Sequence, residues 1–270
     1  MAEGIALVTG AGRGLGRAVA LELARRGFEV VATARRPEAL ADLPGEAPSG
    51  RLRVEALDVT RPDTLRLPDG LRVLVNNAGV EPEYLPVEHT PEATWREIFE
   101  TNVFGLVEVT RRAIPVLRAS GGGVVCNVTS SSLLGPVPFY AAYRASKAAV
   151  SALGESLRAE LAPFGIRVLE ILPGPIATDM LARSDRLPEA ARWPEYRAMA
   201  ERLQAGRQQS AALTTSAPDA ARAIADAILD PDAPLRVGCD PLARGLLDGW
   251  RAQGDEAFQR AMLPAFVGKS

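Results

Sequence analysis

The feature that most constrains the fold is a repeated alternation between short apolar runs and longer segments with helical periodicity. The first run, Ile5–Val8, leads through a glycine-rich turn to a segment from Gly14 to Arg26 in which Leu15, Val19 and Leu23 recur at helical spacing. The same alternation predicts strands at residues 29–33, 51–57, 71–75, 123–129 and 166–172, and helices at about 91–119 and 140–162. Near-continuous apolar strands suit a parallel sheet buried on both faces, so the pattern predicts a doubly wound α/β fold.

The rest of the chain gives no sign of a second domain. We find no repeat, linker or low-complexity segment in the 270 residues, and we expect one domain over 1–270. Residues 36–50 are predicted to hold one weak helix. The stretch 173–216 has no predicted strand, and it follows the carboxyl end of one, where α/β folds bind ligands. We therefore expect a substrate lid at about 176–216; the alternative is a surface excursion without function.

Composition excludes several classes of function. The chain has 31 basic and 33 acidic residues and a net charge of −2, which predicts no surface for nucleic acid or acidic membranes. Its two cysteines, Cys126 and Cys239, lie in unrelated contexts, so we expect no disulfide framework, a reducing compartment and a cytoplasmic location. The single histidine, His89, is interpreted as a loop residue, and no metal site is predicted. We also expect neither a signal peptide nor a membrane span.

The turn after the first strand carries glycines at Gly10, Gly14 and Gly16. Glycines allow backbone N–H groups to approach a pyrophosphate, and the helix that follows offers its positive N-terminus. The G-x-G-x-x-G form fails because Leu15 stands where its last glycine belongs. A single glycine turn is weak evidence, but its place between the first strand and the first helix favours a nucleotide site.

A tyrosine and a lysine one helical turn apart form the candidate catalytic pair. Tyr143 and Lys147 share a helix face, and Lys147 is one of only two lysines in a chain whose other cations are almost all arginine. An ammonium about 4 Å from a phenol favours phenolate by on the order of 4 kcal/mol, enough to bring a tyrosine pKa towards neutrality. The alternative is an ordinary surface pair. Ser130, thirteen residues before Tyr143 at the end of a predicted strand, strengthens the catalytic interpretation.

These motifs resemble those of the classical short-chain dehydrogenase/reductase family, a Rossmann-type fold. Three further segments match in order: Asp58-Val59, the turn from Asn76 to Gly79, and Pro173 to Thr178. The resemblance covers roughly residues 3 to 180, and Arg72 departs from it where many members carry Asp. It implies that the cofactor is bound by Gly10, Arg13, Gly14, Leu15, Gly16, Arg35, Asp58, Val59, Asn77, Ala78, Gly79, Tyr143, Lys147, Pro173, Gly174, Ile176 and Thr178.

The resemblance also implies the roles of four catalytic residues. Tyr143 exchanges a proton with the substrate oxygen, and Ser130 hydrogen-bonds that oxygen. Because Ser131 and Ser132 follow directly, the position of this serine could be off by one residue. Lys147 lowers the pKa of the tyrosine and binds the cofactor ribose. Asn102, inside the long central helix, holds a water that serves the lysine; the alternative is a buried, satisfied asparagine. The implied reaction is hydride transfer between a nicotinamide cofactor and an alcohol or carbonyl compound, in a homodimer or homotetramer.

The end of the second strand predicts which cofactor is preferred. NAD-binding sites of this sort usually place Asp or Glu there to bind the ribose 2′-hydroxyl. Here Ala34 takes that place and is followed by Arg35 and Arg36, while Arg13 lies in the glycine turn. The absence of a carboxylate and the presence of guanidinium groups favour NADP(H), with NAD possible as the alternative. Arg35 and Arg36 could instead begin a solvated loop.

Two rival functions remain open on the same scaffold. A lyase resembling halohydrin dehalogenases would replace the lysine by arginine and lose the glycine turn, whereas a non-catalytic nucleotide-sensing module would not need Ser130, Tyr143 and Lys147 together. The substrate is not readable, although four residues suggest an apolar pocket if they are not simply core: Phe139, Trp193, Tyr196 and Met199. Residues 235–240 and the helix after them are similar to short-chain enzymes that act on steroids, retinoids or lipids.

Overall fold

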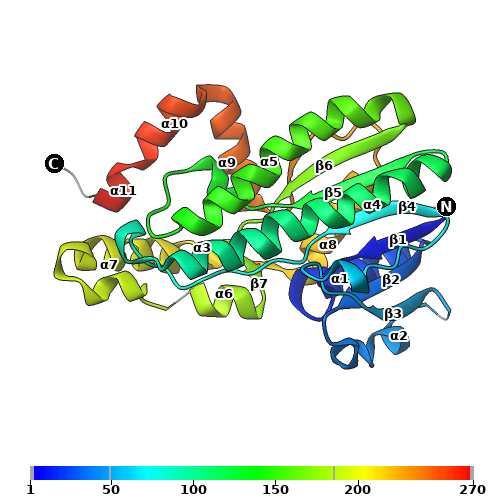
Figure 1. The fold of residues 1–270 in the computed structure, drawn as a ribbon. Coiled ribbons are helices and arrows are strands. Elements are labelled where there is room, and N and C mark those ends of the chain that lie inside the picture. Colours follow the sequence, from blue (N-terminus) through cyan, green and yellow to red (C-terminus); the bar gives the residue numbers. More distant parts are fainter. Residues whose placement is uncertain (1–2, 49, 185, 268–270) are drawn as a thin grey trace.

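A computed structural model of the chain describes residues 3–48, 50–184 and 186–267, and its fold is drawn in Figure 1. Across these residues the main sheet has seven parallel strands in the order β3-β2-β1-β4-β5-β6-β9. They are β1 (Ile5–Val8), β2 (Glu29–Ala34), β3 (Leu52–Ala56), β4 (Leu71–Asn76), β5 (Gly123–Val128), β6 (Ile166–Leu172) and β9 (Arg236–Gly238). The doubly wound fold is thus confirmed, and each of the six predicted strands lies within one residue of its expected bounds.

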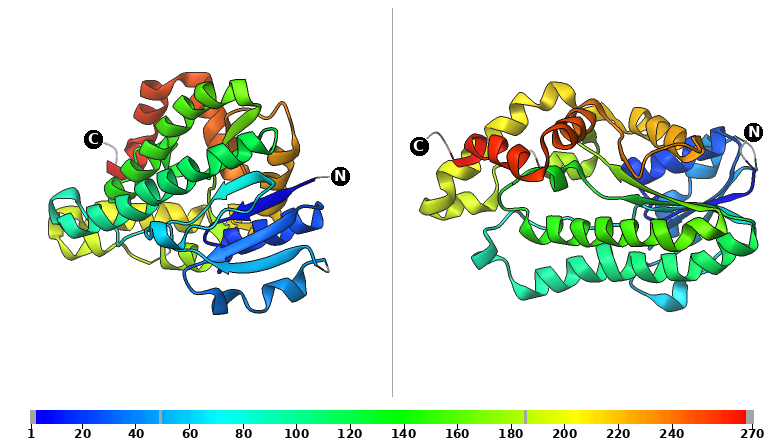
Figure 2. Two further views of the ribbon diagram at one scale, coloured as in Figure 1. Left: turned by 45° about the vertical axis from the view of Figure 1, so that its right-hand side comes forward. Right: turned by 90° about the horizontal axis from the view of Figure 1, so that it is seen from above.

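Two helical layers cover the sheet (Figure 2). One face packs against α1 (Gly14–Arg25) and α8 (Ala217–Leu229), and the other packs against α4 (Leu106–Ala119) and α5 (Ala141–Leu161). In β1, Ala6 and Val8 belong to the first core cluster and Leu7 to the second, and all three are fully buried. Because successive strand residues point to opposite faces, a strand covered on both sides must be apolar throughout, as the sequence is.

The order of the strands places the site. β1 pairs with β2 on one side and β4 on the other, so the direction in which the chain winds reverses between β1 and β4. In an open α/β sheet the ligand crevice lies outside the carboxyl ends of the strands at such a reversal. The turns that follow β1 and β4 are the glycine turn and the turn from Asn76 to Gly79, and both therefore open into the crevice.

The long helix predicted at 91–119 is interrupted. It begins as α3 (Glu92–Phe99), passes through a π-helical segment at Glu100–Gly105, and continues as α4. A Cβ on Gly105 would lie 2.7 Å from Val59, so the segment crosses the end of β3 at close range. π-helical turns inside α-helices frequently occur at functional sites, and this one contains Asn102. The weak helix expected within 36–50 is α2 (Leu43–Glu46), which follows a 3-10 turn at Pro37–Leu40.

Residues 173–216, the insertion after β6, are joined by a short sheet where they leave and re-enter the main fold. The expectation that 173–216 lacks a strand is wrong, because β7 (Ile176–Ala177) pairs with β8 (Thr215–Ser216) in a small parallel sheet. Strands of two residues leave no periodic signature in a sequence. Between them lie α6 (Asp179–Ser184) and α7 (Pro194–Gln209).

The chain ends in α9 (Pro241–Gln253), α10 (Asp255–Met262) and α11 (Pro264–Val267). Figures 1 and 2 show that these helices return to α7, where Arg202 Nε donates to the carbonyl oxygen of Phe266 at 2.7 Å. The insertion and the C-terminal helices therefore form one continuous wall. Within the described ranges, no helix combines the length and the apolar character needed to cross a lipid bilayer.

Candidate active site

The glycine turn after β1 leaves no room for side chains. Gly10 and Gly14 have φ angles of +67° and +56°, a region that glycine adopts without strain. A Cβ on Gly10 would lie 2.7 Å from Cα of Ala78, and one on Gly16 would lie 2.6 Å from the carbonyl oxygen of Gly10. Because α1 begins at Gly14, the unpaired N–H groups of its first turn lie at this bare backbone. The arrangement fits an anionic pyrophosphate.

Thr9 and Asn77 connect the glycine turn to the turn after β4. The hydroxyl of Thr9 accepts hydrogen bonds from the backbone N–H groups of Asn77 and Ala78, both at 3.0 Å. In return, Nδ2 of Asn77 donates to the carbonyl oxygens of Thr9 at 3.0 Å and Gly10 at 3.1 Å. Since Thr9 is only 1% exposed, these bonds are shielded from water. The two motifs thus form one rigid unit.

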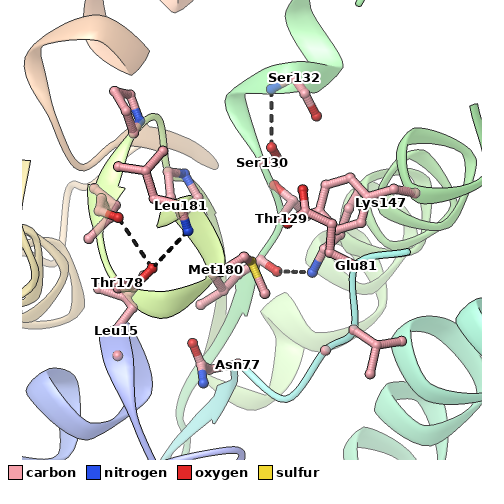
Figure 3. Close-up of a pocket in the computed structure, with 18 of the residues that line it drawn as sticks. Leu15, Asn77, Glu81, Thr129, Ser130, Ser132, Lys147, Thr178, Met180 and Leu181 are labelled. Atoms are coloured by element: carbon pink, nitrogen blue, oxygen red, sulfur yellow. Dashed lines mark hydrogen bonds between the residues drawn. The ribbon is translucent and has the colours of Figure 1, made fainter. Parts of the chain in front are cut away.

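A cavity of about 780 Å³ lies at the carboxyl ends of the strands, and Figure 3 shows part of its lining. The residues predicted to bind the cofactor all line it, and Ser130 does as well. Those residues are Gly10, Arg13, Gly14, Leu15, Gly16, Arg35, Asp58, Val59, Asn77, Ala78, Gly79, Tyr143, Lys147, Pro173, Gly174, Ile176 and Thr178. The structure therefore gathers motifs that are scattered over most of the chain into one cavity.

At one end of the cavity the lining is basic. β2 ends at Ala34, and Arg35 and Arg36 follow it with exposed side chains. Asp58 also lines the cavity, and its Oδ1 accepts hydrogen bonds from the backbone N–H of Thr60 at 3.0 Å and from the Thr60 hydroxyl at 2.8 Å. The end of β2 thus presents a small side chain and two guanidinium groups where a carboxylate would select the ribose 2′-hydroxyl.

Arg13 also lines the cavity, but it has a partner of its own. Its guanidinium lies 3.6 Å from the carboxylate of Asp179, and the two side chains are 66% and 72% exposed. An ion pair as exposed as this contributes little to stability and gives way readily to a stronger anion. Arg13 is therefore placed at the glycine turn as predicted and can turn towards a phosphate there.

Tyr143 and Lys147 project from the first turns of α5 into the cavity. They are 8% and 6% exposed, and Lys147 Nζ donates to the carbonyl oxygen of Val128 at 2.9 Å. The ammonium lies 5.7 Å from the centroid of the Tyr143 ring. Ser130 begins a 3-10 turn after β5, where its hydroxyl accepts the N–H of Ser132 at 3.2 Å, and it lines the cavity with Tyr143. The three predicted catalytic groups therefore line one cavity, and Figure 3 shows Ser130 and Lys147 in its wall.

Burial controls the protonation of both α5 groups. It raises the pKa of Tyr143 above its usual value; the charge of Glu81 raises it further, and the hydrogen bond from Ser130 lowers it. Burial also lowers the pKa of Lys147 to about 8, against the attraction of Glu81. For both groups, the free-energy cost of removing the charged form from water is larger than the effect of the neighbouring charges. The sequence led us to expect a lowered pKa for Tyr143, but in the protein without cofactor this pKa is raised. The phenol therefore keeps its proton.

Asn102 lies behind the cavity rather than in its wall. Its Oδ1 accepts the N–H of Val80 at 2.8 Å, and its Nδ2 donates to the carbonyl oxygen of Val80 at 3.0 Å and to the hydroxyl of Ser146 at 3.1 Å. A Cβ on Gly79 would lie 3.2 Å from Oδ1 of Asn102 and 3.6 Å from Nζ of Lys147. Asn102 thus orients the turn after β4 close to Lys147. That Asn102 also holds a water stays a prediction.

The turn after β6 has a partner that the sequence motifs do not reveal. Oδ2 of Asp240 accepts the N–H of Gly174 at 2.6 Å, and Oδ1 accepts the N–H of Ala243 at 2.9 Å as the N-cap of α9. Asp240 is fully buried. The Asp-Pro pair before α9 signals a helix start in the sequence, but nothing there indicates that the same carboxylate reaches a loop 66 residues away.

The far end of the cavity is apolar and is built by the insertion and the C-terminal helices. Its apolar residues are Val137, Met180, Leu181, Leu203, Leu242, Leu246, Met262 and Phe266. The four residues expected to form such a pocket do not line it. Instead, Phe139 belongs to a small core beside α7, and Tyr196 and Met199 pack against that core. Trp193 stacks on His89, with ring centroids 4.0 Å apart. The alternative interpretation as core is therefore correct for Phe139, while the other three residues are half-buried.

The fold and the site define a Rossmann-type oxidoreductase, and comparisons with known proteins identify its family. The family model for short chain dehydrogenases matches residues 4–188. An uncharacterised oxidoreductase of Bacillus subtilis is 39% identical over 199 residues, which cover 68% of this chain and 69% of that protein. The NADPH-dependent 1-acyldihydroxyacetone phosphate reductase of Saccharomyces cerevisiae is 36% identical over 207 residues, covering 72% and 68% of the two chains.

Among solved structures, a short chain dehydrogenase of Burkholderia cenocepacia in complex with NADP has a TM-score of 0.75 and 29% identity, and the match covers 99% of this chain and 98% of that one. The chain therefore belongs to the short-chain dehydrogenase/reductase family. It is an oxidoreductase that transfers hydride between a nicotinamide cofactor and an alcohol or carbonyl compound. The lyase and the nucleotide-sensing module find no support among these relatives.

Proposed function

We propose that this protein is an NADP(H)-preferring reductase of apolar carbonyl compounds in which Tyr143 is the proton donor. The observation that carries the proposal is a neutral, buried phenol that shares one cavity with Ser130, Lys147 and the glycine turn. When bound, the nicotinamide supplies the hydride that reduces the carbonyl carbon. The residues of the chain bind and orient the cofactor and the substrate, and they transfer the proton.

Each polar group at the reacting end has one task. Tyr143 gives its proton to the carbonyl oxygen, and Ser130 donates a hydrogen bond to that oxygen as negative charge develops. Lys147, held by the carbonyl of Val128, places its positive charge beside the phenol as it becomes phenolate. Lys147 then returns a proton to the Tyr143 phenolate. Asn102 keeps the turn after β4 in place and is the proposed holder of a water through which Lys147 regains that proton.

The bare glycine turn fits a dinucleotide, and the lining suggests how it lies. The backbone of Gly10 to Gly16 would hold the pyrophosphate, Asp58 and Val59 the adenine, and the turn at Asn77 to Gly79 the ribose side. Tyr143 and Lys147 would bind the nicotinamide ribose, while Pro173, Gly174, Ile176 and Thr178 would hold the nicotinamide. Arg35, with Arg13 on the other side, would bind the 2′-phosphate that distinguishes NADP from NAD. The name of the yeast relative and the NADP complex of the Burkholderia enzyme support this preference.

The substrate proposed is an apolar ketone or aldehyde. The far wall of the cavity is made by aliphatic and aromatic side chains of the insertion and of α9 to α11, and such a lining favours ligands whose bulk is apolar. The similarity of residues 235–240 to enzymes of steroids, retinoids and lipids points the same way. We further propose that residues 176–216 act as a lid and that the protein works in the cytoplasm. The homodimer or homotetramer implied by the family would pair α4 and α5 between subunits.

One screen tests the function. The purified protein is mixed with NADPH or NADH and a panel of apolar and polar ketones and aldehydes, and loss of the reduced-nicotinamide absorbance is followed. We expect turnover with apolar carbonyls, at a kcat/KM higher with NADPH than with NADH. Equal or better activity with NADH would refute the proposed cofactor preference, and activity confined to small polar carbonyls would refute the proposed substrate class.

A further inference from the structure

Four side chains that the proposed mechanism does not use cluster beside the catalytic tyrosine. Glu81 and Tyr84 follow the turn after β4, Tyr140 immediately precedes α5, and Arg207 comes from α7 in the insertion. Glu81, Tyr140 and Arg207 line the same cavity as Tyr143. The carboxyl group of Glu81 and the guanidinium group of Arg207 are half-buried in the cavity wall, where charged groups lose part of their hydration, so their presence calls for a function.

The two tyrosines and the arginine are held in a defined geometry. The rings of Tyr84 and Tyr140 are stacked, with centroids 4.4 Å apart and planes 12° from parallel. Cζ of Arg207 lies 4.6 Å from the Tyr84 centroid and 5.3 Å from that of Tyr140, and its Nη2 donates to the Tyr140 hydroxyl at 2.7 Å. Tyr140 in turn contacts the ring of Tyr143 edge-on at 5.9 Å. The cluster thus extends from the insertion to the catalytic ring.

Glu81 is the acidic member of this cluster. It lines the cavity together with Tyr140, Arg207 and Lys147. The phenols of Tyr84 and Tyr140 and the charges of Arg207 and Lys147 all act to lower the pKa of its carboxyl group. These four groups and Tyr143 are the titratable or charged side chains that face it. Burial raises the pKa of Glu81, and all four partners oppose that rise, so the partners stabilise the carboxylate form. Figure 3 shows Glu81 and Lys147 on the same side of the pocket.

We propose that Glu81 is a positioning residue of the active site, whose carboxylate, in the same cavity wall as Tyr140 and Arg207, keeps the proton on Tyr143 and so sets the pH range of the reaction. A negative charge near a phenol disfavours phenolate, and it acts strongly where water is excluded. Carbonyl reduction therefore continues into the alkaline range, whereas alcohol oxidation, which needs phenolate, requires a higher pH. The inference rests on the proposed role of Tyr143 as proton donor.

The test compares two substitutions that remove the same charge. Glu81→Gln keeps the shape of the side chain, and Glu83→Gln is the matched control, because Glu83 is exposed and lies two residues away. The pH profiles of kcat/KM for reduction and for oxidation are measured for both. We expect the Tyr143-dependent limb of each profile to move about one pH unit lower in Glu81→Gln and to stay in place in Glu83→Gln. Unchanged limbs in Glu81→Gln, or a shift upwards, would overturn the proposal.

Two further measurements keep the outcome clear. Glu81→Asp retains the charge, so its profile should resemble that of the wild type; a downward shift equal to that of Glu81→Gln would show that packing, not charge, is responsible and would refute the proposal. Tyrosinate absorbance, taken as the difference between each protein and its Tyr143→Phe counterpart, gives the titration of Tyr143 without turnover. If the wild type reduces no carbonyl compound, the proposed function fails, while this titration still decides the role of Glu81.

Discussion

Tyr143 is kept neutral by its own surroundings. The side chain is 8% exposed, and burial raises its pKa, while the lysine one turn later is bound to a backbone carbonyl. Charge proximity along a helix could be predicted from the sequence, but the degree of burial and the carbonyl of Val128 could not, because both depend on how α5 packs against β5. A buried phenol that holds its proton at neutral pH is ready to act as an acid.

The first prediction removes that proton. Tyr143→Phe should lower kcat by more than about tenfold, which corresponds to roughly 1.4 kcal/mol of barrier, and leave cofactor binding nearly intact, because only the donor hydroxyl is lost. Stopped-flow or steady-state kinetics and cofactor titration by fluorescence measure the two effects. Tyr196→Phe is the control, since the Tyr196 hydroxyl bonds Glu88 outside the cavity. Retention of more than a tenth of kcat in Tyr143→Phe would exclude it as the acid.

At the scale of elements, the sequence predicted the strands and helices well and their interruptions poorly. Apolar runs fix a buried strand to within a residue, as in β6 (Ile166–Leu172). The π-helical segment at Glu100–Gly105 and the two-residue strands β7 and β8 have no comparable signal, because their geometry is imposed by close tertiary contacts such as that of Gly105 with Val59. Motif residues near strand ends were placed correctly, since parallel strands share one carboxyl edge.

The end of β2 carries the second prediction. Arg35→Ala should remove most of the preference for NADPH over NADH, and Ala34→Asp should reverse it, because a charge-assisted contact contributes roughly 1.5–3 kcal/mol, or a factor of about 10 to 150. The preference is measured as the ratio of kcat/KM with NADPH to kcat/KM with NADH. Arg53→Ala is the control, because Arg53 on the neighbouring strand β3 is exposed and does not line the cavity. An unchanged ratio in Arg35→Ala would place the 2′-phosphate elsewhere.

The third prediction concerns the joint between β9, α9 and the turn after β6. Asp240→Asn keeps an oxygen for the N–H of Ala243 but turns an amide towards the N–H of Gly174, so it should raise the KM for the cofactor by about tenfold. Asp240→Ala loses the cap as well and should also lower stability by about 1–4 kcal/mol. Asp255→Asn, at the exposed start of α10, is the control. An unchanged cofactor KM in Asp240→Asn, with kcat altered instead, would contradict the idea that Asp240 positions the turn after β6 for cofactor binding.

At the scale of the whole molecule, the part of the cavity formed by the strand ends could be predicted from the sequence, and the far wall of the cavity could not. Residues 4–188 match the family model, and the residues predicted to bind the cofactor and transfer the proton lie in that range and line the cavity. The wall opposite them is built by α7, α9, α10 and α11, whose amphipathic patterns say only that they are helices. Their positions depend on single long-range contacts, such as Arg202 with the carbonyl of Phe266, 64 residues apart. Such contacts leave no pattern that spacing alone can reveal.

The last prediction is that this wall closes over the ligands. α7 touches the catalytic region through Arg207 and the C-terminal helices through Arg202, so any movement of α7 that admits substrate must break both contacts and re-form them on closure. Backbone amides of residues 180–210 should exchange faster in the free protein and become protected with NADPH and an unreactive substrate analogue, whereas those of α4 should change little. Hydrogen exchange by mass spectrometry measures this. Arg202→Ala should increase exchange in α7 and α11 together, while Arg197→Ala, an exposed position on the same helix, should not. Equal protection of residues 180–210 with and without ligands would mean that the wall is static and that substrate enters by another route.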